Sequence, residues 1–196
     1  MFKELKKSVL LFSGLTLICS VAYPFTMNMI GEYAFADQAK GSLVYEGKTV
    51  VGSTLIAQNF TKAYYFHPRL SAAGTNGYDG TSSGGSNYGY TSQKLHDAVK
   101  ARVEAYRSEN NLSSAQKVPM DAVTTSGSGL DPHISVMNAM IQAKRIAASR
   151  GIEETQVIKL LRENIQKPYW GIIGEEKVNV FNLNLILDRE FGKVKI

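Results

Sequence analysis

The first strong pattern in the chain is a run without charged residues from Ser8 to Ile30. As an α-helix this run is about 34 Å long, slightly more than the roughly 30 Å hydrocarbon core of a bilayer. Residues 8–30 are therefore predicted to form one transmembrane helix. A cleavable signal peptide is the alternative, because Ala34-Phe35-Ala36 has the form of a cleavage site. The apolar run is longer than the roughly 7–15 residues of the hydrophobic region of a signal peptide, which favours a retained anchor.

The charges on either side of this run predict its orientation. The basic residues before it are Lys3, Lys6 and Lys7, and the acidic residues after it are Glu32 and Asp37. Positive residues stay on the cytoplasmic side of a spanning helix. Residues 1–7 are therefore expected in the cytoplasm and residues 31–196 outside it.

Beyond the anchor, short apolar stretches alternate with turn residues. Two such stretches, around Val44 and at Val50-Val51, flank Glu46-Gly47-Lys48 and predict a β-hairpin. The following segment, residues 53–60, fits either a strand or a short helix.

Three later segments repeat apolar residues with the helical period. They run from Ser92 to about Glu109, from the N-cap Ser135 to Arg150, and from Glu153 to about Gln166. Gly151 is expected to end the second helix in a left-handed conformation. Residues 178–187 alternate apolar and polar residues as a half-buried strand does, with a short helix from Asn184 as the alternative. The fold class is α+β: one transmembrane helix, then a single extracytoplasmic domain over residues 31–196 with about three helices and a small sheet.

Composition excludes several classes of function. The net charge is +5, but the basic residues are scattered among acidic ones, so no nucleic-acid stripe is present. The chain has one cysteine, Cys19, which excludes an intrachain disulfide and a redox pair. The three histidines, His67, His96 and His133, are far apart in the sequence, so no metal site is predicted.

Residues 74–92 are rich in glycine, serine and tyrosine and cannot build a core. A loop of this length inside a domain is usually functional or disordered. Consecutive amides of glycine and serine can form an anion-binding nest. The candidate positions for nucleotide contact are Ser83, Gly84, Gly85, Ser86 and Asn87. Gly47-Lys48-Thr49 ends like a phosphate-binding loop, but Ser42 stands where the first glycine is required.

Two polar motifs could carry chemistry. The first comprises His67, Pro68 and Arg69; the second comprises Ser126, Gly127, Ser128, Gly129, Asp131, Pro132 and His133. A membrane-tethered hydrolase using Asp131 and His133 is one interpretation. The nucleophile elbow G-x-S-x-G is not matched, and glycine, aspartate and proline are the residues that tight turns require. The turn interpretation is favoured, and no catalytic residue is predicted.

The same stretches resemble a known family. GSTLIAQNF (52–60), YFHPRLSA (65–72), SGGSNYG (83–89), VPMDAVTTSGSGLDPHIS (118–135) and KVNVFNLNLILD (177–188) are similar to blocks of the C subunit of the Kdp potassium-transporting P-type ATPase. The resemblance covers nearly the whole chain. It implies a subunit of a bacterial or archaeal plasma-membrane complex. The implied partners are a channel-like potassium-conducting subunit, an ATP-hydrolysing pump subunit and a small single-span subunit.

The resemblance also implies a catalytic chaperone that raises the affinity of the pump subunit for ATP. A domain outside the cell cannot touch cytosolic ATP, so two mechanisms stay open. Either the block at residues 83–87 contacts nucleotide inside the cell, or the domain caps the outer mouth of the conducting subunit without nucleotide contact and acts through the complex. No cofactor is predicted on this chain; ATP is implied for the complex. A solute-binding module with residues 74–92 as its lid is a third class.

Overall fold

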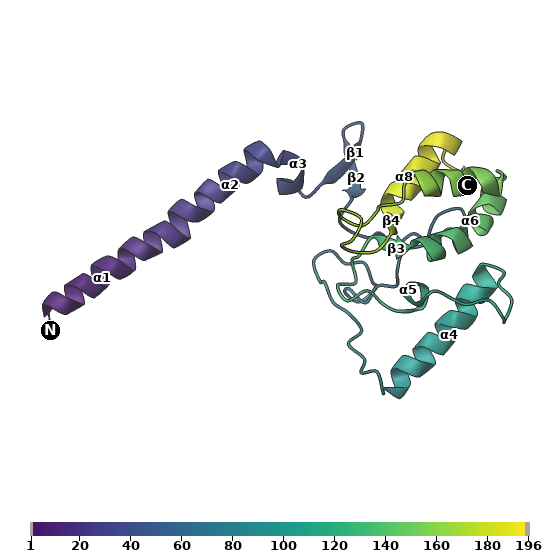
Figure 1. Cartoon of the computed structure of the whole chain (residues 1–196), viewed down its shortest axis with the longest axis horizontal. Helices are drawn as coiled ribbons and strands as arrows, with labels where there is room; N and C mark the ends of the chain where they lie inside the picture. Colours follow the sequence, from purple (N-terminus) through teal and green to yellow (C-terminus); the bar gives the residue numbers. More distant parts are fainter. Residues whose placement is uncertain (1, 195–196) are drawn as a thin grey trace. The chain divides into compact units, whose positions relative to one another are not determined.

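The computed structural model describes residues 2–194 (Figure 1). The chain divides into two compact units, one within residues 1–50 and the other within residues 51–196. Each unit is described by itself.

The first unit is dominated by one long helix. It consists of α1 (Phe2–Leu17), a π-helical turn η1 (Ile18–Ala22) and α2 (Tyr23–Ala34). Pro24 explains the wide turn, because proline has no N–H for the carbonyl four residues earlier and the helix must accommodate that loss. Over Phe2–Ala34 the helix is long and apolar enough to cross a membrane, and none of the window is buried within the protein. The predicted span, residues 8–30, lies inside it. A short helix, α3 (Ala36–Ala39), follows.

The predicted hairpin is confirmed. Strands β1 (Leu43–Glu46) and β2 (Thr49–Ser53) form a two-stranded sheet. Gly47 stands at the turn with φ 63°, a left-handed conformation that glycine adopts without strain. Residues 54–60 form neither the strand nor the helix that the sequence allowed, but a turn and an irregular segment.

The three predicted helices of the second unit are present. They are α4 (Gln93–Glu109), α6 (Val136–Arg150) and α7 (Glu154–Glu163); a further short helix is α5 (Met120–Val123). Ser135 caps α6 by accepting a hydrogen bond from Asn138 N–H, and Gly151 ends it with φ 66°. Helix α7 stops three residues before the predicted end, at Glu163.

The predicted strand over residues 178–187 is wrong beyond its first two residues. Strand β4 covers only Lys177–Asn179 and pairs antiparallel with β3 (His133–Ser135). Helix α8 (Val180–Phe191) begins at once, capped by the Asn179 side chain, which accepts the Asn182 N–H. Val180, Leu183 and Leu187 are buried, and their spacing is that of one helix face. Helix packing therefore overrides the local alternation.

The core lies among α6, α7, α8 and the β3–β4 pair (Figure 1 shows α6 and α8 in green and yellow). Its buried apolar residues are Phe66, Ile134, Ala139, Ala143, Ile146, Ala147, Val157, Leu160, Leu161, Val178, Val180, Leu183 and Leu187.

The segment around Phe66 has no secondary structure and is held by buried polar side chains. Asn184 of α8 accepts from Phe66 N–H (2.8 Å) and donates to Phe66 O (2.9 Å). Gln142 of α6 makes the same pair of bonds to His67, at 2.7 and 3.2 Å. Buried backbone groups need such partners where no ladder supplies them. Two helices thus determine the path of the chain that leads to Arg69.

Candidate functional site

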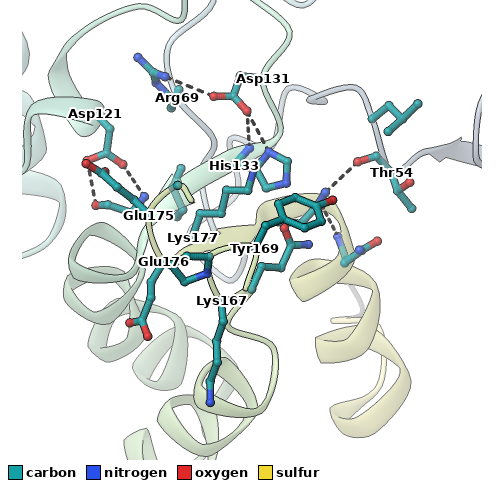
Figure 2. Close-up of a pocket in the computed structure, with 18 of the residues that line it drawn as sticks. Thr54, Arg69, Asp121, Asp131, His133, Lys167, Tyr169, Glu175, Glu176 and Lys177 are labelled. Atoms are coloured by element: carbon teal, nitrogen blue, oxygen red, sulfur yellow. Dashed lines mark hydrogen bonds and ion pairs between the residues drawn. The ribbon is translucent and has the colours of Figure 1, made fainter. Parts of the chain in front are cut away.

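The two polar motifs of the sequence meet at Asp131. Arg69 Nη1 lies 3.2 Å from Asp131 Oδ2. The other carboxylate oxygen, Oδ1, accepts from His133 N–H at 3.0 Å and lies 3.0 Å from His133 Nδ1 (Figure 2). The Asp131 carboxylate therefore connects the two motifs, although Arg69 lies 62 positions before it in the sequence.

Contacts with Thr125 and Tyr78 hold Arg69 in place. The next residue, Leu70, forms a parallel bridge with Thr125, and Arg69 Nη2 reaches Thr125 O at 3.5 Å. Tyr78 Oη donates to Arg69 O at 2.9 Å. Burial raises the pKa of Tyr78 to about 12, so this hydroxyl stays protonated and remains a donor.

Asp131 stays charged over the whole range of ordinary pH. Burial alone would raise its pKa, but the hydrogen bonds from the side chain and backbone N–H of His133, together with the charge of that ring and the Arg69 contact, lower the pKa to about 2. Asp131 therefore acts as a permanent anion that orders Arg69 and His133.

The second motif packs against the glycine-rich segment. Ser83 Oγ and Gly84 N–H both donate to Ser128 O, at 2.8 and 2.9 Å. Ser86 Oγ lies 2.9 Å from Thr125 Oγ1. Gly129 has φ 69°, and a Cβ placed there would lie 2.5 Å from Gly84 O. A side chain at Gly129 would therefore collide with the glycine-rich segment.

These contacts bear on the predicted nest. The amide of Gly84 already has a partner within the chain, and Asn87 adopts a left-handed φ of 52°. Alternation of right- and left-handed residues is the backbone form of a nest. Anion or nucleotide contact at Ser83, Gly84, Gly85, Ser86 and Asn87 stays a prediction.

An open groove of about 840 Å³ lies beside the Asp131 cluster (Figure 2). One side comes from the segment between α7 and β4, including Tyr169 and Ile173, and another comes from Thr54 and Leu55. Its acidic, basic and histidine lining residues are Arg69, Asp121, Asp131, His133, Lys167, Glu175, Glu176 and Lys177. A second hollow shares Leu55, Arg69, Asp131 and His133 and adds Ile56 and the turn Ser126–Ser128. The motif residues therefore form one mixed polar and apolar surface.

Asp121 was not singled out in the sequence, although it lies within the motif block. Its carboxylate accepts from Ser135 N–H (2.8 Å), Ser135 Oγ (2.9 Å) and Asn138 Nδ2 (3.0 Å). An aspartate one residue into a short helix after proline is a common acidic first-turn residue, so its sequence context carried no distinguishing signal. In the fold it ties α5 to the start of α6 at the edge of the groove.

His67 does not join this cluster. Its Nδ1 lies 2.7 Å from Glu109 Oε1, and Arg145 Nε lies 3.7 Å from the same oxygen. The hydrogen bond from His67 lowers the pKa of Glu109 against the opposing effect of burial. Pro68 stands between His67 and Arg69, so one short motif links this ion-pair cluster to the groove.

The geometry differs from that of a hydrolase. Within residues 2–194, the His133 ring bonds to Asp131, and no hydrogen bond joins it to a serine. Ser126 Oγ and Ser128 Oγ lie 3.1 Å apart, and Ser126 is 2% exposed. A nucleophile needs a base within hydrogen-bond reach and access to substrate. Within the described chain, no group of three or more potential metal ligands occurs.

The chain thus combines a candidate membrane helix with a folded unit whose motif residues line a groove. The family model described as "KdpC: K+-transporting ATPase, c chain" matches residues 5–189. The chain belongs to this family.

Several similar proteins are each described as "Potassium-transporting ATPase KdpC subunit". The protein of Mycobacterium bovis (strain BCG / Pasteur 1173P2) is 48% identical over 189 residues, covering 96% of this chain and 100% of the relative. That of Rhodospirillum rubrum is 47% identical over 191 residues, covering 97% and 98%. That of Polynucleobacter asymbioticus is 46% identical over 187 residues, covering 95% and 98%. The resemblance seen in the sequence is confirmed.

Proposed function

We propose that this protein is the non-catalytic accessory subunit of an ATP-driven potassium uptake complex in a bacterial or archaeal plasma membrane. Its partners are the potassium-conducting subunit, the ATP-hydrolysing pump subunit and a small single-span subunit. Family membership supports the complex. The groove beside Asp131 is the observation that carries the role, because it offers ordered charges and exposed apolar side chains without a catalytic constellation.

The groove is proposed to dock on the outer face of the conducting subunit. Charged pairs such as Arg69 and Asp131 are held in fixed geometry, which favours selective rather than promiscuous contact. Leu55 in the groove and Ile56 in the adjoining hollow are exposed large apolar residues beside those charges. Apolar contact surrounded by oriented charges is typical of protein interfaces.

The effect on ATP is proposed to be indirect. If docking favours one conformation of the complex, the affinity of the pump for ATP changes through a coupling free energy. Such couplings typically change an affinity by about 5- to 150-fold. This mechanism needs no nucleotide at residues 83–87. It accounts for a chaperone role in a domain on the outer side of the membrane.

Reversing the charge of two groove lysines tests the docking surface. Lys167→Glu with Lys177→Glu is expected to reduce the recovery of partner subunits after mild detergent extraction by roughly tenfold or more. The reversed charges would repel the partner groups that the lysines attract, and a loss of about 1.4 kcal/mol is already tenfold. In the complex that remains, the KM for ATP is expected to rise while kcat changes little. Potassium-stimulated ATP hydrolysis at varied ATP measures both.

The matched control is Lys144→Glu with Lys159→Glu. These two lysines are exposed on α6 and α7 and do not line the groove. The control carries the same change in charge and should leave recovery and KM at parental values. Equal loss in both double variants, or unchanged recovery in the groove variant, contradicts docking through the groove.

Orientation separates the two mechanisms. Tyr90, 85% exposed and three residues after the candidate nest, is replaced by cysteine in a chain whose Cys19 is serine. A membrane-impermeant thiol reagent added to intact cells is expected to label this cysteine, because the basic end of the helix stays inside. Labelling only after the cells are opened places the unit in the cytoplasm. The capping mechanism then fails, and direct nucleotide contact takes its place.

A further inference from the structure

The segment between α7 and β4 carries a dense group of exposed apolar side chains. Within five consecutive residues, Tyr169, Trp170, Ile172 and Ile173 are 79, 87, 81 and 54% exposed. Trp170 is the single tryptophan of the chain. Tyr169 and Ile173 line the groove, whereas Trp170 and Ile172 do not. We call residues 169–173 the tip. Docking through the groove leaves its two most exposed side chains, Trp170 and Ile172, without a partner surface.

The tip is also built so that its backbone makes its own hydrogen bonds. Tyr169 N–H donates to Ile173 O at 2.9 Å, and Ile173 N–H donates back to Tyr169 O at 3.0 Å. The amides of Gly171 and Ile172 donate to Pro168 O and Tyr169 O, at 3.1 and 3.2 Å. At the base, Gln166 and Lys177 exchange two bonds, at 2.8 and 3.2 Å. Four of the five amides in Tyr169–Ile173 therefore have partners in the same segment, which lowers the cost of removing water from them.

The residue types favour the interface of a bilayer. Tryptophan and tyrosine concentrate where the hydrocarbon meets the headgroups, since one part of the ring system is apolar and another forms hydrogen bonds. No charged residue occurs between Pro168 and Gly174, and Lys167 stands at the edge of the tip. The tip is thus an uncharged aromatic and aliphatic loop with charged residues on both sides, Lys167 before it and Glu175 and Glu176 after it.

The N-terminal helix supplies a link between the second unit and a bilayer. The chain carries its own candidate membrane helix, Phe2–Ala34. Residues 35–50 connect it to the second unit and extend to at most about 55 Å. A tether of that length keeps the unit at a high local concentration beside the membrane, so that weak insertion becomes effective.

We propose that Tyr169–Ile173 inserts into the headgroup region of the bilayer and is a second membrane contact of this protein. The proposal rests only on the membrane anchor. Because either orientation of the helix leaves the unit beside a lipid surface, it stands or fails independently of the proposed function.

Fluorescence of the full chain in vesicles tests the proposal directly, because Trp170 is the single source of tryptophan emission. The chain is reconstituted into phosphatidylcholine vesicles with plain acyl chains and into vesicles with brominated acyl chains, which quench tryptophan on contact. Emission is expected to lose most of its intensity in the brominated vesicles. Equal intensity in both vesicles overturns the proposal.

Two variants distinguish insertion from mere proximity. Trp170→Phe with Tyr90→Trp moves the fluorophore to a similarly exposed position in the polar glycine-rich segment, where no bromine quenching is expected. Tyr169→Ser with Ile172→Ser keeps Trp170 and should lose most of the quenching, while far-ultraviolet circular dichroism stays parental. Specific insertion of the tip is contradicted if bromine quenches tryptophan at position 90 as strongly as Trp170. It is also contradicted if quenching of Trp170 is undiminished in the serine variant.

A protein partner leaves a different signature. Acrylamide quenches exposed tryptophan in water. If Trp170 becomes protected from acrylamide only when the potassium-conducting and pump subunits are reconstituted together with the chain, and bromine has no effect, then the tip binds protein and insertion is overturned.

Discussion

Replacing Arg145 with methionine is expected to lower the free energy of unfolding of the second unit by about 3–5 kcal/mol, which is the range for removing one partner of a buried charged network. Arg145 is 9% exposed. Its Nη1 donates to the carbonyls of Ala63 and Tyr65, its Nη2 donates to Gln142 Oε1 at 2.9 Å, and its Nε donates to Asn110 Oδ1 at 3.2 Å. The methionine removes these donors; Gln142 Oε1 keeps the His67 N–H, whereas the buried Asn110 Oδ1 loses the Arg145 donor.

Urea unfolding of the full chain in detergent, followed by circular dichroism, measures this change. Arg162→Met on the exposed part of α7 is the control and should change the unfolding free energy by less than about 0.5 kcal/mol. Arg145→Lys retains the charge but loses the planar set of donors, so an intermediate loss is expected. A stability of the methionine variant within about 1 kcal/mol of the parent would show that the chain before Arg69 does not depend on this side chain.

Replacing Gly129 with alanine is expected to destabilise the second unit by roughly 2–5 kcal/mol and to weaken assembly with the partner subunits. The new Cβ would lie 2.5 Å from Gly84 O and 2.8 Å from both Ala73 N and Ala73 Cβ. Two of those three atoms belong to the backbone and cannot turn aside. Overpacking typically costs about 1–3 kcal/mol, and the left-handed conformation costs a side chain about 1–2 kcal/mol more.

Gly127→Ala is the matched control in the same motif. A Cβ at Gly127 meets no atom within 4 Å, and its backbone is not left-handed. Stability and recovery of the complex should therefore stay near parental values. Similar losses in the two alanine variants would mean that the motif is sensitive to any added side chain, and the close approach to Gly84 would not be the cause.

Helix α6 shows what local sequence signals can predict. Ser135 and Gly151 act within one turn of the helix ends, and both ends lie at the predicted residues. Helix α8 shows the opposite case. The apolar residues from Val178 onward fit both an alternating strand and a helix face, and only the packing of Leu183 and Leu187 in the core decides between them.

The sequence predicts the candidate site in its parts but not in its arrangement. It identifies Arg69, Asp131 and His133 as unusual residues, and these three do meet. It groups His67 with the same motif, whereas His67 contacts Glu109 instead. One available signal was overlooked. Polar residues recur at helical spacing along α6, at Asn138, Gln142 and Arg145, and all three are buried.

The sequence by itself determined the charge-free N-terminal helix, the β-hairpin and the helix caps, because each depends on residues a few positions apart. It also determined the family, through motif blocks along nearly the whole chain. Only the tertiary structure decided that the glycine-rich segment packs on the Ser126–Gly129 turn, that Asp131 joins Arg69 to His133, and that a groove opens beside them. Those contacts join residues far apart in the sequence. They form only when long loops close around a shared core, and a pattern of neighbouring residues does not predict such closure.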